Sequence, residues 1–169
     1  MKNTECEYFL SSMLSEEKNK NNLMEKQENL HKELELIQAV INRMANNSFL
    51  IKGWTMTLMS ALIALGKDSI LGNLNGIYYL IMMIGVLVPF WWLDAYYLKQ
   101  ERIFRKIYER AIADPDSKNR NRYDLNPREM AKEVKSVVKT MWVEAISWFY
   151  IPFILLIVLG IILKISGFL

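Results

Sequence analysis

Three apolar blocks, each with a single charged residue, constrain the fold of this chain more than any other feature of its sequence. They occupy residues 49–66, 77–97 and 145–169. A helix of about eighteen residues rises about 27 Å, close to the hydrocarbon thickness of a bilayer. The sequence therefore predicts an all-α integral membrane protein. The third block decides the number of crossings, which is three if it spans the bilayer and two if it is re-entrant or packs against a neighbour.

Charged residues are concentrated between these blocks and divide the chain of 169 residues into four parts. The first is a polar tail. The second combines a cytoplasmic helix, a transmembrane hairpin and a continuing cytoplasmic helix. The third is a basic loop followed by an amphipathic helix, which Pro127 can open because proline fits the first turn of a helix. The fourth is a C-terminal transmembrane helix. The four parts cover residues 1–22, 23–113, 114–144 and 145–169.

An apolar seam runs along the predicted helix of residues 23–47. Its members recur at alternating steps of four and three residues, as in a coiled coil, and Glu and Lys fill the other faces. The seam consists of Leu30, Leu34, Ile37, Ile41 and Met44. Two interpretations are open at this point: the seam packs on another part of its own chain, or it joins the subunits of an oligomer.

The distribution of positive charge predicts the orientation in the membrane. Residues 99–139 contain twelve Lys or Arg and seven Asp or Glu, whereas residues 67–75 contain a single Lys. Because cytoplasmic loops carry an excess of Lys and Arg, the longer segment is expected in the cytoplasm. The prediction is therefore a cytoplasmic N-terminus, with the C-terminus outside if the third block spans the bilayer. An aromatic belt marks the cytoplasmic end of the second crossing, at Trp91, Trp92, Tyr96 and Tyr97.

A stripe of small and polar residues follows one narrow face of the helix that enters the first crossing. Its members are Asn42, Asn46, Gly53, Thr57, Ser60 and Ala64. Small residues let helices approach closely in lipid, and hydroxyl groups can hydrogen-bond across the interface. In one interpretation, this face packs against the other crossings of the same chain. In the other, several copies turn it inward to line a pore, with the Asn side chains at its cytoplasmic mouth.

Lys52 and Asp94 are the charged residues nearest the cytoplasmic ends of the first two crossings. In an antiparallel hairpin they lie at similar depth, where an unpaired charge is costly. The sequence therefore predicts an ion pair between them. In the alternative, each side chain reaches the lipid headgroups alone.

A basic patch lies in the loop after the second crossing, beside the aromatic residue Tyr123. It consists of Lys118, Arg120, Arg122 and Arg128. Such a patch could bind RNA, a nucleotide or anionic lipid. The simpler interpretation is a solvated loop that obeys the positive-inside rule.

The residues of common catalytic and metal sites are scarce. His31 is the only histidine and Cys6 the only cysteine, so one chain cannot assemble the usual zinc site. No Gly-rich phosphate loop is present, because the glycines are isolated. The sequence predicts neither an enzyme nor a bound cofactor or metal.

Two segments at the cytoplasmic ends of the hairpin carry a family resemblance. Residues 41–54 read INRMANNSFLIKGW, and residues 92–105 read WLDAYYLKQERIFR. Together they resemble small bacterial membrane proteins of the SLATT type. The accessory membrane proteins of type VI CRISPR and RNA-editing defence systems are similar in size and plan. The resemblance covers about residues 30–108 and implies two core membrane helices flanked by cytoplasmic helices.

The resemblance also implies a location in the bacterial inner membrane, which makes the outer C-terminus periplasmic, and a role in antiphage defence. Members of this family are thought to act as pore-forming effectors beside nucleotide-signalling or nuclease systems. The expectation is therefore a homo-oligomeric pore that depolarises the inner membrane when a nucleotide or RNA signal, or a soluble defence partner, acts at its cytoplasmic face. The alternative is a non-conducting scaffold that recruits a soluble defence enzyme or partner to the bilayer.

Overall fold

The computed structural model describes residues 2–72, 75–115, 123 and 125–166, with side chains at residues 10, 13–66, 76–115, 123 and 125–166. This part of the chain contains helices and no strand, which confirms the predicted all-α class. The helices are α1 (Lys2–Gly72), α2 (Asn75–Ala113), α3 (Arg128–Ala131), α4 (Val137–Met141) and α5 (Glu144–Ile165).

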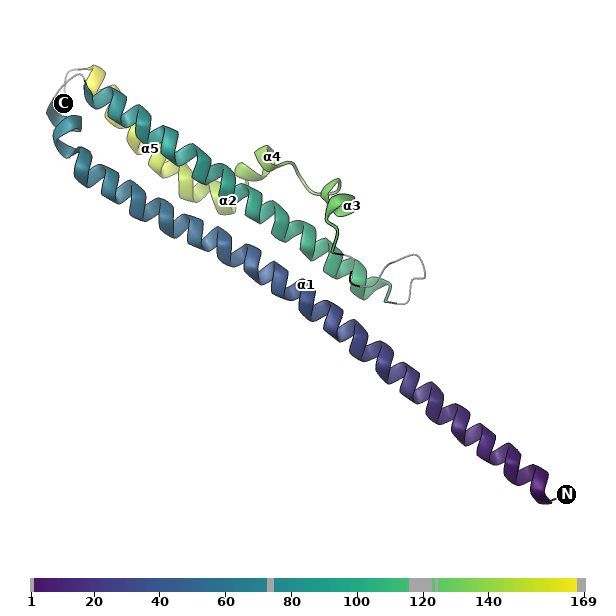
Figure 1. Cartoon of the computed structure of the whole chain (residues 1–169). Coiled ribbons are helices and arrows are strands. Elements are labelled where there is room, and N and C mark those ends of the chain that lie inside the picture. Colours follow the sequence, from purple (N-terminus) through teal and green to yellow (C-terminus); the bar gives the residue numbers. More distant parts are fainter. Residues whose placement is uncertain (1, 73–74, 116–122, 124, 167–169) are drawn as a thin grey trace.

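Helix α1 is longer than the sequence suggests. The predicted polar tail, cytoplasmic helix and first crossing form one continuous helix of 71 residues, which at 1.5 Å per residue is about 105 Å long. Its N-terminal end projects far beyond every other helix (Figure 1). The described side chains of residues 13–28 are all exposed, so none of them is buried against the described part of the chain.

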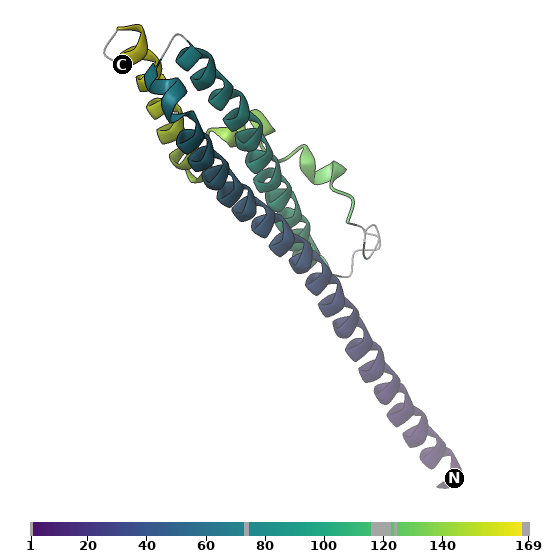
Figure 2. The same cartoon turned by 60° about the vertical axis from the view of Figure 1, so that its left-hand side comes forward.

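Helices α1 and α2 lie side by side and antiparallel, as both Figure 1 and Figure 2 show. Towards the charged end of the hairpin, Ile37 and Ile41 of the apolar seam are buried against the far end of α2. Their buried partners there are Ile103, Ile107 and Ala111. The centre of the seam is therefore used within the chain, which decides against an inter-subunit seam at these positions.

A second apolar cluster joins all three long helices, and α2 contributes most of it. Met59 comes from α1, and the members from α5 are Ile146, Tyr150 and Ile157. The members from α2 are Leu80, Met83, Leu87, Trp91 and Ala95. Their steps of three and four residues put these five side chains on one side of α2. Helix α2 is thus the shared packing partner of α1 and α5.

Three helices are long and apolar enough to cross a membrane: α1, α2 and α5. Helix α5 runs for 22 residues through Pro152 without a turn, and its far end lies near the adjoining ends of α1 and α2 (Figure 1). The third apolar block is therefore one straight element beside the hairpin and not a re-entrant loop. The large apolar side chains that these helices leave exposed include Trp54, Leu65, Ile81, Leu155 and Ile162, as expected for surfaces that face lipid.

The segment expected to form one amphipathic helix before the third block contains two short helices instead, α3 and α4. The break has a local cause, because Ser136 adopts an extended conformation (ψ 158°) and caps α4 by accepting a hydrogen bond from the Lys139 amide. Serine is favoured at this capping position because its hydroxyl satisfies an unpaired amide of the first turn. A second extended residue, Val143, starts α5 in a new direction.

Gly66, near the far end of α1, leaves room for the ring of Tyr79 on α2, whose hydroxyl donates to the Leu62 carbonyl at 2.5 Å. A methyl group at Gly66 would overlap that ring. We expect Gly66→Ala to displace Tyr79, break this hydrogen bond and lower the free energy of unfolding by about 1–3 kcal/mol. Unfolding in detergent with increasing SDS, followed by circular dichroism, measures the loss.

Gly85→Ala is the matched control. Nothing lies within 4 Å of a methyl group added at Gly85, and alanine is favoured over glycine in a helix by up to about 1 kcal/mol. This variant should be as stable as the wild type or slightly more stable. Equal unfolding curves for both glycine variants would contradict the packing described for Gly66.

Candidate functional site

A buried charge network lies where the apolar parts of the three long helices give way to charged sequence. Its centre is Asp94 of α2, whose side chain is completely buried. Lys52 of α1 reaches it, and the Lys52 ammonium lies 2.6 Å from Asp94 Oδ2 and 2.9 Å from Oδ1. The structure thus brings the two predicted partners together, and the Lys52 side chain remains only 25 % exposed.

Ser48 is the second residue of α1 that contacts the Asp94 carboxylate. Its hydroxyl donates a short hydrogen bond to Asp94 Oδ1 and accepts one from the Lys52 ammonium at 3.1 Å. Asp94 Oδ2 forms an ion pair with the same ammonium and has no hydrogen bond among the described residues. One carboxylate therefore joins two helices through a hydroxyl and an ammonium.

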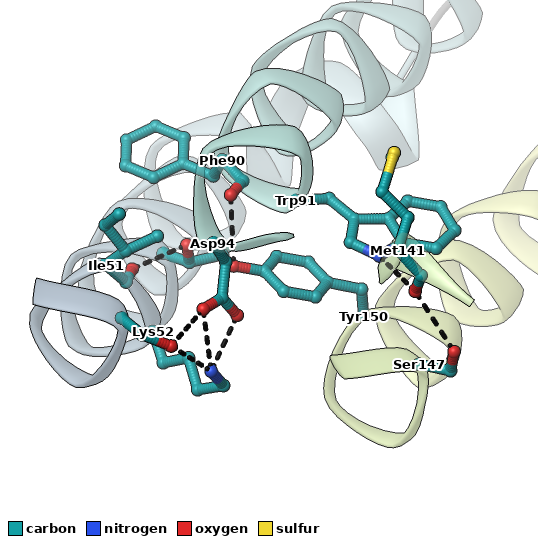
Figure 3. A network of polar contacts seen from close by, with 10 residues as sticks. Ile51, Lys52, Phe90, Trp91, Asp94, Met141, Ser147 and Tyr150 are labelled. Atoms are coloured by element: carbon teal, nitrogen blue, oxygen red, sulfur yellow. Dashed lines mark hydrogen bonds and ion pairs between the residues drawn. The ribbon is translucent and has the colours of Figure 1, made fainter. Parts of the chain in front are cut away.

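Helix α5 adds Tyr150 to the network. Tyr150 is fully buried and points toward Asp94 (Figure 3). Its hydroxyl donates to the Phe90 carbonyl at 3.3 Å, and its ring stacks on Trp91 with centroids 5.9 Å apart. Tyr150 therefore lies buried beside Asp94, and its own hydroxyl is hydrogen-bonded.

The Met141 carbonyl fixes the end of α4 beside this network. It accepts hydrogen bonds from the Trp91 indole at 3.1 Å and from the Ser147 hydroxyl at 3.2 Å (Figure 3). Three segments of the chain thus meet at one backbone oxygen. These hydrogen bonds hold the link between α4 and α5 against α2 beside Trp91, about one helical turn from Asp94.

The network fastens the hairpin and gives α1 a fixed rotation. Because a buried charge without a partner is strongly destabilising, Asp94 must face Lys52 and Ser48. Thr55 and Met59 are buried on the same face of α1 as Ser48. This face therefore points inward, and the opposite face of α1 must point away from α2.

The small polar stripe lies on that opposite face. With 100° between successive residues, its mean direction is about 150° from the buried face of α1. All six members are exposed: Asn42, Asn46, Gly53, Thr57, Ser60 and Ala64. Nothing in the chain lies within 4 Å of a methyl group added at Gly53. The stripe does not pack within one subunit, and that interpretation of it was wrong.

Two members of the stripe bond locally along α1. The Thr57 hydroxyl donates to the Gly53 carbonyl at 3.0 Å, and the Asn42 side-chain oxygen accepts from Gln38 at 3.2 Å. A hydroxyl bonded to its own helix still has an acceptor position free for a partner. The stripe is therefore compatible with a close approach by another helix.

The predicted basic patch falls mostly outside the described residues, which include neither Lys118 nor Arg120 nor Arg122. Arg128 is exposed at the start of α3. Tyr123 connects the loop to α1, because its amide donates to Glu33 at 3.3 Å. The structure gives no geometry for a ligand at this patch.

Among the residues with described side chains, no group of three His, Cys, Asp or Glu side chains could hold a metal ion. His31 is exposed and lies 3.4 Å from Glu35, one turn further along α1. The candidate site is therefore the inward charge network together with the outward stripe.

Sequence spacing pointed to part of this site only. Lys52 and Asp94 stand out because charges are rare in apolar blocks. Ser48 lies four residues before Lys52, and this helical spacing could have placed it on the same face. Tyr150 could not be assigned from sequence, because nothing in it indicates which side of α2 the third block covers.

Comparison with protein-family models, with curated proteins and with solved structures finds no match to this chain.

Proposed function

We propose that this protein spans the membrane with α1, α2 and α5 and assembles into a homo-oligomeric pore lined by the outward stripe of α1. The single observation that carries the proposal is the exposure of the whole stripe on a rigidly fixed α1. Hydroxyl groups facing lipid gain nothing there, whereas small residues favour close contact between helices. A second copy of the chain supplies such a contact without a new partner.

The stripe has the composition of a narrow polar passage. Asn42 and Asn46 lie on the charged side of the network, and Thr57, Ser60 and Ala64 continue towards the far end of α1. A ring of copies would place amides at the mouth and hydroxyls along the path, groups that can replace part of the hydration of an ion. Lys52 and Asp94 neutralise each other away from this path.

The biological setting follows from the resemblance to SLATT-type proteins and from the charge distribution. In this setting the charged ends of α1 and α2 lie in the bacterial cytoplasm. A signal formed during phage infection acts on them, and opening of the pore dissipates the potential across the inner membrane.

A second candidate function, a non-conducting scaffold, is favoured by the projecting part of α1. Leu10, Met13, Leu14, Leu23 and Met24 are more than half exposed there. A soluble defence protein could bind these side chains and be held at the bilayer. In that case the stripe would serve assembly alone.

Membrane potential in bacteria expressing the full chain, measured with a voltage-sensitive dye with and without phage, separates the two functions. The pore predicts depolarisation that depends on the chain. A potential equal to that of cells without the chain in every condition, together with co-purification of a soluble protein, would overturn the pore and support the scaffold.

A further inference from the structure

Residues 128–142, which include α3 and α4, run along α2 from Arg110 to Trp91 and lead to α5, and the end of α4 reaches the height where the apolar helices end. The hydrogen bond from Trp91 to the Met141 carbonyl fixes this height on α2. In both views the segment lies along the outside of the helix bundle, and α4 is next to the start of α5 (Figures 1 and 2). In a membrane-spanning chain, the end of α4 therefore lies in the headgroup layer.

This connecting segment has an inward and an outward side. Its inward side chains pack on the two apolar clusters: Met130, Ala131 and Val134 on one, and Val137 and Met141 on the other. On the outward side, Val138 is 63 % exposed and Trp142 is 66 % exposed. Large apolar side chains that the chain leaves uncovered at this height are suited to the interface of a bilayer.

Trp142 belongs to a belt of aromatic side chains around the bundle. Its ring packs edge-on against Trp91, with centroids 5.4 Å apart. Trp92 and Tyr96 on α2 and Trp148 on α5 are exposed near the same height. Aromatic belts mark the boundary between acyl chains and headgroups. Residues just before Trp142 in the chain therefore lie at the depth of the lipid phosphates.

The ion pairs of residues 128–142 leave this segment with unpaired positive charge. Glu129 and Glu133 face α2, where they pair with Arg110 at 3.0 Å and Lys106 at 2.8 Å. The hydrogen bond from Lys106 lowers the pKa of Glu133, which keeps that pair charged. Both acidic side chains of the segment therefore form ion pairs with basic side chains of α2.

The lysines of the segment face outward. Lys132, Lys135 and Lys139 are exposed, and no ion pair to them occurs within the part of the chain that the structure describes. Lys139 lies beside Val138 on α4, and Lys135 precedes the capping residue Ser136. Lys135 and Lys139 therefore lie close in the chain to the exposed apolar and aromatic side chains of Val138 and Trp142.

We propose that Lys135, Lys139 and Trp142 form a binding site for anionic phospholipid headgroups. The ammonium groups contact the lipid phosphate, and Trp142 with Val138 inserts at the boundary of the acyl chains. The site rests on the membrane crossing proposed above and is independent of whether the assembly conducts ions. It would hold the connection between α2 and α5 against the bilayer.

The test is lipid retention by the full-length protein. The chain is placed in nanodiscs of equal parts phosphatidylglycerol and phosphatidylcholine, released inside a mass spectrometer, and the lipids that stay bound are counted. The wild type is expected to keep phosphatidylglycerol in preference to phosphatidylcholine. The double variant Lys135→Gln/Lys139→Gln should lose this preference, and Lys135→Arg/Lys139→Arg should keep it.

Lys18→Gln/Lys20→Gln is the matched control, since it removes the same charge from exposed positions on the projecting part of α1. It should retain phosphatidylglycerol like the wild type. Equal retention by both Gln variants, or equal loss in both, would overturn the site. A chain that does not enter nanodiscs at all would overturn the membrane crossing itself, and with it the pore.

Discussion

Lys52→Met is expected to lower the free energy of unfolding by about 3–5 kcal/mol, the cost of leaving a buried charge without its partner. Asp94 is completely buried, and the Lys52 ammonium is the only cation near it among the described residues. Methionine keeps the length of the lysine stem, so the loss reports the charge and not the packing. SDS unfolding of the detergent-solubilised protein, followed by circular dichroism, measures it.

The double variant Lys52→Met/Asp94→Leu separates the charge from its surroundings. Replacing a buried ion pair by apolar residues of similar size is often close to neutral, so this variant should recover much of the stability lost in Lys52→Met. Ser48 then loses its acceptor, which leaves a smaller deficit of about 1 kcal/mol. If Lys52→Met were as stable as the wild type, the network would not fasten the hairpin.

Ser60→Leu and Thr57→Leu are expected to abolish depolarisation while leaving the oligomer assembled. Each adds a large apolar side chain to the outward stripe, where it would narrow a passage lined by α1 and remove a hydroxyl from it. Both positions are exposed in the single chain, so its fold should not change. The voltage-sensitive dye measures the first effect, and chemical cross-linking in membranes measures the second.

Gly85→Leu is the control for added bulk. It lies on an exposed face of α2, where nothing is within 4 Å of an added methyl group, and it is not part of the stripe. Cells expressing it should depolarise like cells expressing the wild type. Depolarisation that persists in both stripe variants would remove the stripe from the conduction path, and loss of cross-linking would reassign it to assembly alone.

The sequence was sufficient for the features that depend on local pattern. The three apolar blocks predicted three helices, because length and hydropathy decide membrane compatibility without reference to neighbours. The partners Lys52 and Asp94 followed from the rarity of charge in such blocks. The seam residues Ile37 and Ile41 were identified as buried, but their partner was not, because α2 and a second subunit offer similar apolar surfaces.

The direction in which a helix face points could not be predicted from the sequence. The stripe at Gly53, Thr57 and Ser60 could face inward or outward, and only the buried network on the other side of α1 decides between them. The break between α3 and α4 depends on a single serine capping a helix of five residues. An amphipathic pattern that continues across such a break still looks like one helix.

The projecting end of α1 has a consequence for how this protein can be studied. The described side chains of residues 13–28 are exposed, so this part of α1 depends mainly on helix propensity and on local pairs such as Glu28 with Lys32, at 2.7 Å. Its amide protons should therefore exchange with solvent rapidly in an isolated chain and slowly once neighbouring copies or a bound protein cover it. Hydrogen exchange rates along residues 13–28 would therefore report whether neighbouring copies or another protein cover this part of α1, and the measurement does not require the partner to be known in advance.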